Sequence, residues 1–191
     1  MKSETRHIIL ITFFGLLGSI IIGLIFFQET VFNVKMTNFQ FVSLGLSGAL
    51  FFAMLEYKSL KEQAFTVIII LILHLLLFTG REISVTFIIR DIFYLTALFT
   101  SIKLYHIFIK TYIKINFYVR SLALVTIYAL LNTALGVILF LIVAEQGFPP
   151  FGFIQLLASR AILVGLGLGI GIDFYLQNKE GLFKQRDVLI H

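Results

Sequence analysis

Six long apolar runs dominate the chain and limit what it can fold into. The first covers residues 8–27 without a charged side chain, and the others cover residues 39–55, 64–79, 91–108, 121–144 and 154–175. About 20 apolar residues in a helix cross the hydrocarbon core of a bilayer. The pattern therefore predicts an all-α integral membrane protein, in which residues 1–191 form a single polytopic domain with a bundle of six transmembrane helices.

The composition supports the membrane class. Hydrophobic residues make up 59% of the chain and charged residues 13%, whereas a typical soluble domain has about 45–50% and about 25%. The first run has an apolar stretch longer than the roughly 7–15 residues of a cleavable signal, so we expect it to be retained. The chain has no cysteine, which excludes disulfides and thiolate metal sites.

The distribution of Lys and Arg predicts the orientation. With the N-terminus in the cytoplasm, only Lys35, Arg81 and Arg90 would lie outside, and Arg160 would lie within the last span. The remaining basic residues would all lie on the cytoplasmic side: Lys2, Arg6, Lys58, Lys61, Lys103, Lys110, Lys114, Arg120, Lys179, Lys184 and Arg186. Because cytoplasmic loops of membrane proteins are enriched in Lys and Arg, both termini are predicted to be cytoplasmic.

Two stretches between the runs allow more than one interpretation. Residues 83–89 alternate with a period of two, which favours a short interfacial segment followed by a fourth span that begins at Asp91 as its N-cap. The alternative is one tilted helix over residues 83–108 that contains Arg90 and Asp91. Residues 109–120 mix basic and aromatic side chains, a composition typical of a helix lying on anionic headgroups.

The polar residues that a membrane protein would not need for folding gather on the outer side. They are expected near the outer ends of the third to sixth spans: His74, Arg81, Glu82, Arg90, Asp91, Glu145 and Arg160. Arg160 stands out because it lies about six residues inside its span, and charges at membrane depth usually serve a function. These residues are the candidate binding site for an anionic or zwitterionic group. The structural alternative is that they form interfacial ion pairs while Arg160 extends to the headgroups.

Three polar residues within the runs have mainly structural explanations. His74 could relay protons, but a hydrogen bond within the bundle is the simpler expectation. Asn132 is expected to form a hydrogen bond between helices. Asp173 lies near the cytoplasmic interface, where Lys103 or His106 of the fourth span could pair with it.

Small residues at four-residue intervals predict close helix packing. Gly15, Ser19 and Gly23 share one face of the first helix. In the last span, Gly165 pairs with Gly169 and Gly167 with Gly171 on nearly opposite faces, so this helix is expected to lie between two close neighbours. The spacing does not fit a dinucleotide-binding fingerprint, and no strand precedes it.

One short motif carries a resemblance to a known family. Gly45-Leu46-Ser47-Gly48 resembles the G-x-S-G motif of rhomboid proteases, whose core also has six spans. The resemblance implies Ser47 as nucleophile, with His74 as a partner at comparable depth. However, that family places its serine in the fourth span and its histidine in the sixth, and here they fall in the second and third.

Three functions follow as hypotheses. The first is binding or transport of a small solute or lipid headgroup at the outer polar cluster, and the second is a non-enzymatic signalling or scaffold subunit that docks a cytoplasmic partner. The third and remotest is an intramembrane serine hydrolase. No catalytic residue, metal site, cofactor or nucleic-acid partner is predicted. The expected partners are the bilayer, anionic headgroups at the basic loops, and a small solute or a partner membrane subunit. The expected location is a prokaryotic plasma (inner) membrane.

Overall fold

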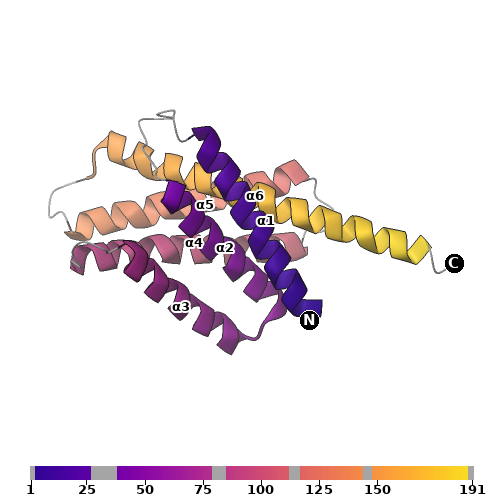
Figure 1. Cartoon of the computed structure of the whole chain (residues 1–191). Coiled ribbons are helices and arrows are strands. Elements are labelled where there is room, and N and C mark those ends of the chain that lie inside the picture. The colour runs from indigo at the N-terminus through magenta and orange to yellow at the C-terminus, as the bar shows by residue number, and fades with distance from the viewer. Residues whose placement is uncertain (1–2, 27–37, 79–84, 112–116, 144–147, 189–191) are drawn as a thin grey trace.

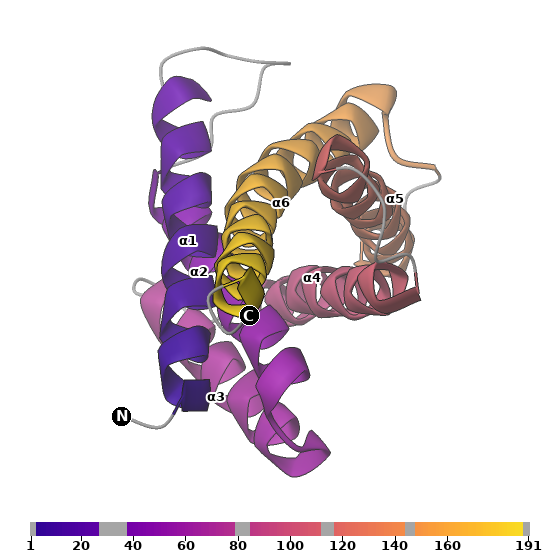
Figure 2. The same cartoon turned by 90° about the vertical axis from the view of Figure 1, so that its right-hand side faces the viewer.

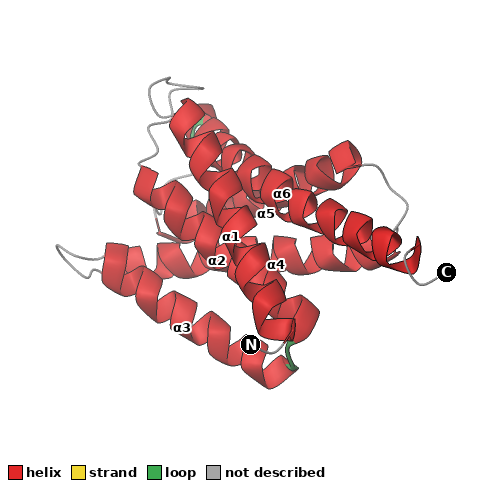
Figure 3. Cartoon of the chain, turned by 45° about the vertical axis from the view of Figure 1, so that its right-hand side comes forward, coloured by secondary structure: helices red, strands yellow, loops and turns green. Residues whose placement is uncertain are grey.

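Six helices make up nearly all of the structure. The computed structural model describes residues 3–26, 38–78, 85–111, 117–143 and 148–188. No strand occurs within these ranges (Figure 3), so the all-α prediction is confirmed. The helices are α1 (Ser3–Phe26), α2 (Asn38–Tyr57), α3 (Leu60–Phe78), α4 (Val85–Thr111), α5 (Phe117–Val143) and α6 (Phe151–Val188).

The helices have the length and surface of a membrane protein. Four apolar segments are long enough to cross a bilayer, namely Glu4–Ile25, Asp91–Thr111, Tyr118–Val143 and Phe151–Asn178, and α2 contributes a shorter one, Val42–Tyr57. Large apolar side chains face outward, with Leu24, Leu130 and Ile142 each more than 60% exposed, while Ser19, Ser101 and Asp173 are fully buried. A soluble monomer rarely exposes so much apolar surface. Helices also satisfy their own backbone hydrogen bonds, as lipid surroundings require.

Helix α6 lies at the centre of the arrangement. It packs extensively against α5 on one side and α1 on the other, while α4 packs against α5 and α2 against α1 (Figures 1 and 2). Helix α3 is peripheral and contacts α2 and α4. The last residues of α6 extend past the other helices, towards the C-terminus (Figure 1).

One end of the bundle, which we call the basic end, contains the start of α1, the α2–α3 turn and the end of α4. It carries Arg6, Lys58, Lys61 and Lys110. Lys58 joins α1 to this turn through an ion pair of 3.7 Å with Glu4. The other end, where α2, α4 and α6 begin, is called the opposite end below.

The start of α6 follows from two prolines. Pro149 and Pro150 precede its first residue, Phe151, and a proline at this place loses no helical hydrogen bond. The carbonyl of Pro150 accepts a bond from the amide of Phe153 at 2.9 Å. The two prolines therefore lead directly into the first turn of α6.

The predicted start of the fourth helix was wrong. Helix α4 begins at Val85, so Asp91 lies within the helix and is buried, with 3% of its surface exposed. The structure therefore agrees with the alternative of one continuous helix that contains residues 90 and 91. The alternating pattern misled because Ser84 and Thr86 are polar residues in a stretch whose neighbours are all apolar, and isolated polar residues do not prevent a helix.

The predicted interfacial helix at residues 109–120 was also wrong within the described residues. Residues 109–111 form the last turn of α4, and residues 117–120 form the first turn of α5. Arg120 is buried, with 4% of its surface exposed, so it does not lie on headgroups. Its burial has a specific cause, the carboxylate of Asp173, which is described below.

Glu62 closes the first turn of α3. Its carboxylate accepts bonds from the backbone amide of Ser59 at 3.0 Å and from the hydroxyl of Ser59 at 2.8 Å. These two residues have the spacing of a capping box. The backbone bond from Ser59, followed by the hydroxyl bond and the nearby Lys58, lowers the pKa of Glu62 below its usual value of 4.5.

This capping interaction predicts a pH dependence. A carboxyl with a lowered pKa in the folded state contributes stability above its unfolded pKa and loses it as the pH falls through the folded value. We therefore expect Glu62→Gln to lower the melting temperature slightly at neutral pH, and the difference from wild type to shrink below pH 4.5. Thermal unfolding of both proteins across that range checks it. A difference that is the same at all pH values would contradict this role for the carboxylate.

Candidate functional site

A layer of polar side chains crosses the half of the bundle nearer the opposite end. Tyr105 of α4 is hydrogen-bonded to Asp173 of α6, and both helices run away from the opposite end. Counted along the helix, Asp91 lies as far before Tyr105 as Ser159 lies before Asp173, about 21 Å. Asp91 and Arg160, the residue after Ser159, therefore lie at similar depth. We call Ser43, His74, Asp91, Thr133 and Arg160 the polar layer.

Arg160 is the charged residue of this layer that has no partner among the described residues. It is partly buried, and its Nε atom is buried without a hydrogen-bond partner. It makes no ion pair with any of the described residues. A guanidinium stays charged at all ordinary pH values, and a charge inside a membrane normally pairs with an opposite charge. The guanidinium therefore keeps unused hydrogen-bond donors at this depth.

Two polar residues near Arg160 belong to α5. The amide nitrogen of Asn132 donates to the carbonyl of Leu157 at 3.0 Å and so joins α5 to α6 one turn from Arg160. The next residue, Thr133, has a buried hydroxyl without a hydrogen-bond partner in the described part of the chain. This hydroxyl therefore adds a donor or acceptor at the depth of the guanidinium.

His74 and Asp91 add buried polar groups from α3 and α4. The Nδ1 atom of His74 lies 3.1 Å from the hydroxyl of Ser43, and 6% of His74 is exposed. Ser43 lies one turn before Ser47, the serine of the G-x-S-G motif. Asp91 is buried and interacts with its surroundings, although its Oδ2 atom has no hydrogen bond to the described residues.

Part of the predicted outer cluster lies outside the described residues. This applies to Arg81, Glu82 and Glu145, and to the side chain of Arg90, whose backbone belongs to α4. The structure therefore places three of the predicted ligand-binding residues, which are His74, Asp91 and Arg160.

A second buried polar group lies nearer the basic end. Asp173 is fully buried on α6, and its two oxygens accept bonds from the hydroxyls of Tyr105 at 2.8 Å and Ser121 at 2.7 Å. The Nε atom of Arg120 lies 3.6 Å from the same carboxylate. This group, which we call the Asp173 network, joins α4, α5 and α6. Lys103 and His106, the predicted partners of Asp173, were the wrong ones.

A signal in the sequence does point to Arg120 as the partner of Asp173. Arg120 stands directly before an apolar run, and Asp173 stands close to the end of another. Two opposite charges at the same depth of adjacent antiparallel helices are natural partners in a membrane. His106 instead bonds Glu56 at 2.8 Å, and Lys110 lies 3.6 Å from the same carboxylate.

The basic end holds a third cluster, which ties the N-terminus to α6. The ring of His7 stacks on Tyr57 with centroids 5.5 Å apart, and its Nδ1 atom is hydrogen-bonded to the hydroxyl of Tyr175. The side chains of His7, Tyr57 and Tyr175 contact one another and lie next to the ion pair of Lys58 with Glu4. This cluster fixes the start of α1 against α2 and α6.

The glycines of α6 lie on two faces, each against a different helix. A Cβ atom on Gly165 would lie 3.1 Å from Val125 Cα, and one on Gly169 would lie 3.3 Å from Ser121 Cα, both on α5. On the other face, a Cβ atom on Gly167 would lie 2.7 Å from Ser19 Cα, and one on Gly171 would lie 2.8 Å from Gly15 Cα, both on α1. The backbones of α1 and α6 therefore touch.

The small residues of α1 also face α2. A Cβ atom on Gly15 would overlap that of Ala49, and one on Gly45 would overlap the side chain of Ser19. Gly23 is buried nearer the end of α1. Where these small residues meet, the backbone of α1 lies close to both α2 and α6.

No group of three possible metal-binding His, Cys, Asp or Glu side chains occurs among the described residues. The five residues of the polar layer come from five different helices. They are a cation, a histidine, a carboxylate and two hydroxyls. Comparison of the chain with protein-family models, with curated proteins and with solved structures finds no match in any of the three.

Proposed function

We propose that this protein binds the anionic group of a small solute or of a lipid headgroup at Arg160, as a transporter or the solute-binding subunit of one. The observation that carries the proposal is the buried Nε atom of Arg160, which has no hydrogen-bond partner in the described part of the chain. A carboxylate or phosphate would supply the missing charge and accept charge-assisted hydrogen bonds. Thr133, His74 and Asp91, at similar depth, would contact the remaining polar groups of the ligand.

The proposal includes six spans with both termini in the cytoplasm of a prokaryotic cell. The basic end carries Lys58, which is partly exposed, and the exposed Lys61 and Lys110, which supports its assignment to the cytoplasmic side. The polar layer then lies in the outer half of the membrane. A polar site near membrane depth, formed by glycine-rich helices, is common in transporters.

An Arg160 variant separates a binding role from a structural one. An unpaired charge costs about 2.5–3.5 kcal/mol at the centre of a membrane helix. Arg160→Leu is therefore expected to raise the free energy of unfolding of the ligand-free protein by about 1–3 kcal/mol and to abolish binding. A variant that is more stable than wild type and no longer binds the ligand would show that Arg160 serves binding at a cost in stability.

Native mass spectrometry of the gently solubilised protein is the measurement for binding. We expect wild type to retain an anionic molecule that Arg160→Leu loses, while Arg160→Lys, which keeps the charge but not the planar fork, retains it weakly. Arg6→Gln, which removes an exposed charge at the basic end, is the matched control and should change nothing. Loss of stability in Arg160→Leu, without any retained molecule in wild type, would overturn the proposal.

A scaffold function is the alternative, and one observation favours it. Helix α6 ends at Val188, while its membrane-length apolar segment ends at Asn178. The extra turns extend from the bundle (Figure 1) and could contact a cytoplasmic partner. A partner chain that co-purifies with wild type and is lost when residues 179–191 are deleted would support this alternative.

A further inference from the structure

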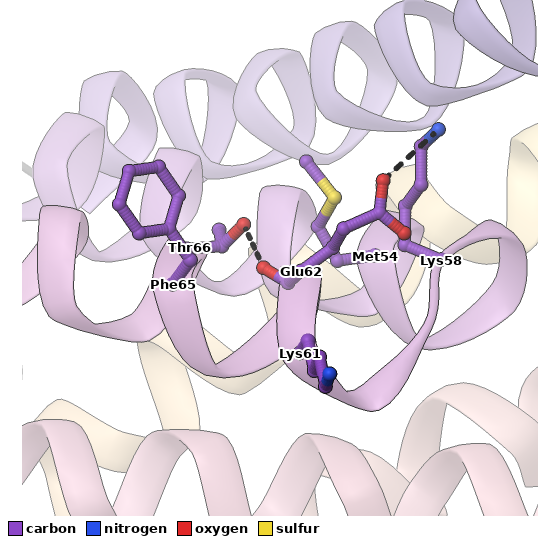
Figure 4. Close-up of a pocket in the computed structure, with 6 residues that line it drawn as sticks. All are labelled: Met54, Lys58, Lys61, Glu62, Phe65 and Thr66. Carbon is purple, nitrogen blue, oxygen red and sulfur yellow. Dashed lines mark hydrogen bonds and ion pairs between the residues drawn. The ribbon is translucent and has the colours of Figure 1, made fainter.

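A hollow of about 370 Å³ lies at the basic end, far from the polar layer. It is lined by residues from the last turn of α2, the α2–α3 turn and the first turns of α3: Met54, Lys58, Lys61, Glu62, Phe65 and Thr66. Figure 4 shows Lys58 directed towards Glu62, while Lys61 points away from that pair. The lining thus combines two lysines and apolar side chains with one carboxylate, that of Glu62, which is paired with Lys58.

The two lysines have unused bonding capacity. Lys58 forms ion pairs of 3.7 Å with Glu4 and 3.6 Å with Glu62, which are longer than the roughly 2.8 Å of a charge-assisted hydrogen bond. Lys61 is exposed and makes no hydrogen bond or ion pair with the described residues. An ammonium can donate three hydrogen bonds, so an anion placed here would find donors available.

An exposed apolar stripe continues from Lys61 along α3. Phe65, Ile68 and Ile72 follow Lys61 at four, seven and eleven residues, so all four share one helix face. The three apolar side chains are 65%, 55% and 50% exposed. In the described part of the chain, α3 packs against α2 and α4. A stripe with a cation at its end matches the shape of a lipid, which has a charged head and an apolar chain.

The length of the stripe also fits. Eleven residues separate Lys61 from Ile72, a rise of about 16 Å. Half of a hydrocarbon core of about 30 Å is about 15 Å. One acyl chain in a single leaflet would therefore cover the stripe from the headgroup to the middle of the bilayer.

We infer that the hollow at the α2–α3 turn binds an anionic phospholipid of the leaflet that meets the basic end. Lys61 is the principal contact for the phosphate, and Lys58 contributes less because Glu4 and Glu62 already share its charge. The acyl chain packs on Phe65, Ile68 and Ile72 and covers the exposed face of α3. This site is independent of Arg160 and of the function proposed for it.

The test is competition between two lipids with the same acyl chains. The full-length protein in detergent is mixed with equal amounts of phosphatidylglycerol and phosphatidylcholine, and the retained lipid is measured by native mass spectrometry. Wild type is expected to retain phosphatidylglycerol preferentially. Because one basic residue near a membrane surface changes binding about fivefold, Lys61→Gln is expected to reduce that preference about fivefold and Lys58→Gln by less.

Two further variants separate the head from the chain. Lys103→Gln removes an exposed lysine of α4 that does not line the hollow, and it should leave the preference unchanged. Phe65→Ser is expected to reduce retention of both lipids, since it interrupts the apolar stripe. All the side chains changed in these variants are at least partly exposed, so the variants are expected to fold as wild type does.

Three outcomes would overturn the inference. They are equal retention of the two lipids by wild type, an unchanged preference in Lys61→Gln, and full competition by glycerol phosphate, which would indicate a site for free phosphate. If Lys61→Gln still retains the anionic molecule whose binding depends on Arg160, failure of the lipid site leaves the proposed function of Arg160 intact.

Discussion

Replacing Asp173 with alanine is expected to lower the free energy of unfolding by about 3–5 kcal/mol, the largest effect expected of any single change in this chain. Asp173 is fully buried, and Arg120 beside it is 4% exposed. Without the carboxylate, the buried guanidinium of Arg120 would lose the opposite charge that lies 3.6 Å from its Nε atom. The hydroxyls of Tyr105 and Ser121 would lose their acceptors at the same time.

The measurement is reversible unfolding of the protein in mixed micelles, and two variants identify the cause. Tyr105→Phe removes one hydrogen bond to a charged group and should cost about 1.5–3 kcal/mol. The double variant Asp173→Leu with Arg120→Met removes both charges together. Because replacing a whole buried ion pair with apolar residues is often neutral or stabilising, it should recover most of the loss. An Asp173→Ala variant as stable as wild type would contradict the pairing.

Gly171→Ala is expected to have the second largest effect, a loss of about 3 kcal/mol, the upper end of the range for overpacking. The added Cβ atom would overlap the carbonyl oxygen of Phe14 and lie 2.8 Å from Gly15 Cα. These are backbone atoms, so no side chain can rotate to make room. The helices α1 and α6 would have to separate along their whole contact.

Other glycines of α6 provide a graded control for this prediction. A Cβ atom added to Gly152 would meet nothing within 4 Å, and alanine there should be neutral or stabilise α6 by up to about 1 kcal/mol. Gly169→Ala should fall between the two, because the nearest atom, Ser121 Cα, would lie at 3.3 Å. Unfolding of the three variants under one condition tests the order. Equal losses at Gly152 and Gly171 would show that helix propensity, and not the contact with α1, controls stability.

Local features that depend on one helix were predictable. The number and type of helices follow from the length of the apolar runs, since a lipid environment leaves the backbone few alternatives. The two faces of α6 follow from a spacing of four residues, which needs only helix geometry. The start of α6 follows from Pro149 and Pro150. The start of α4 was not predicted because the polar residues within 83–89 are isolated among apolar ones. Such a pattern is compatible with a helix as well as with an extended segment.

The partners of polar residues were harder to predict, as Asp173 shows. Lys103 and His106 lie at a suitable depth on α4, yet the carboxylate bonds Tyr105, which lies between them in the sequence and on another side of the helix. Arg120 reaches it from α5. Which of several residues at one depth makes contact depends on the rotation of each helix about its axis, and the apolar runs carry little information about that rotation.

The chain's own order of residues was enough to predict a helical membrane protein and its close-packed glycine faces, and to single out Arg160 as a charge inside a span. Hydrophobic length, small side chains and an isolated charge each act within a single helix and can be recognised without neighbours. The tertiary structure was needed to show that the Nε atom of Arg160 lacks a partner among the described residues while Asp173 has three, and to bring Lys58 and Lys61 around one hollow. Such pairings depend on which helix faces meet, because a contact between helices belongs to neither sequence segment alone.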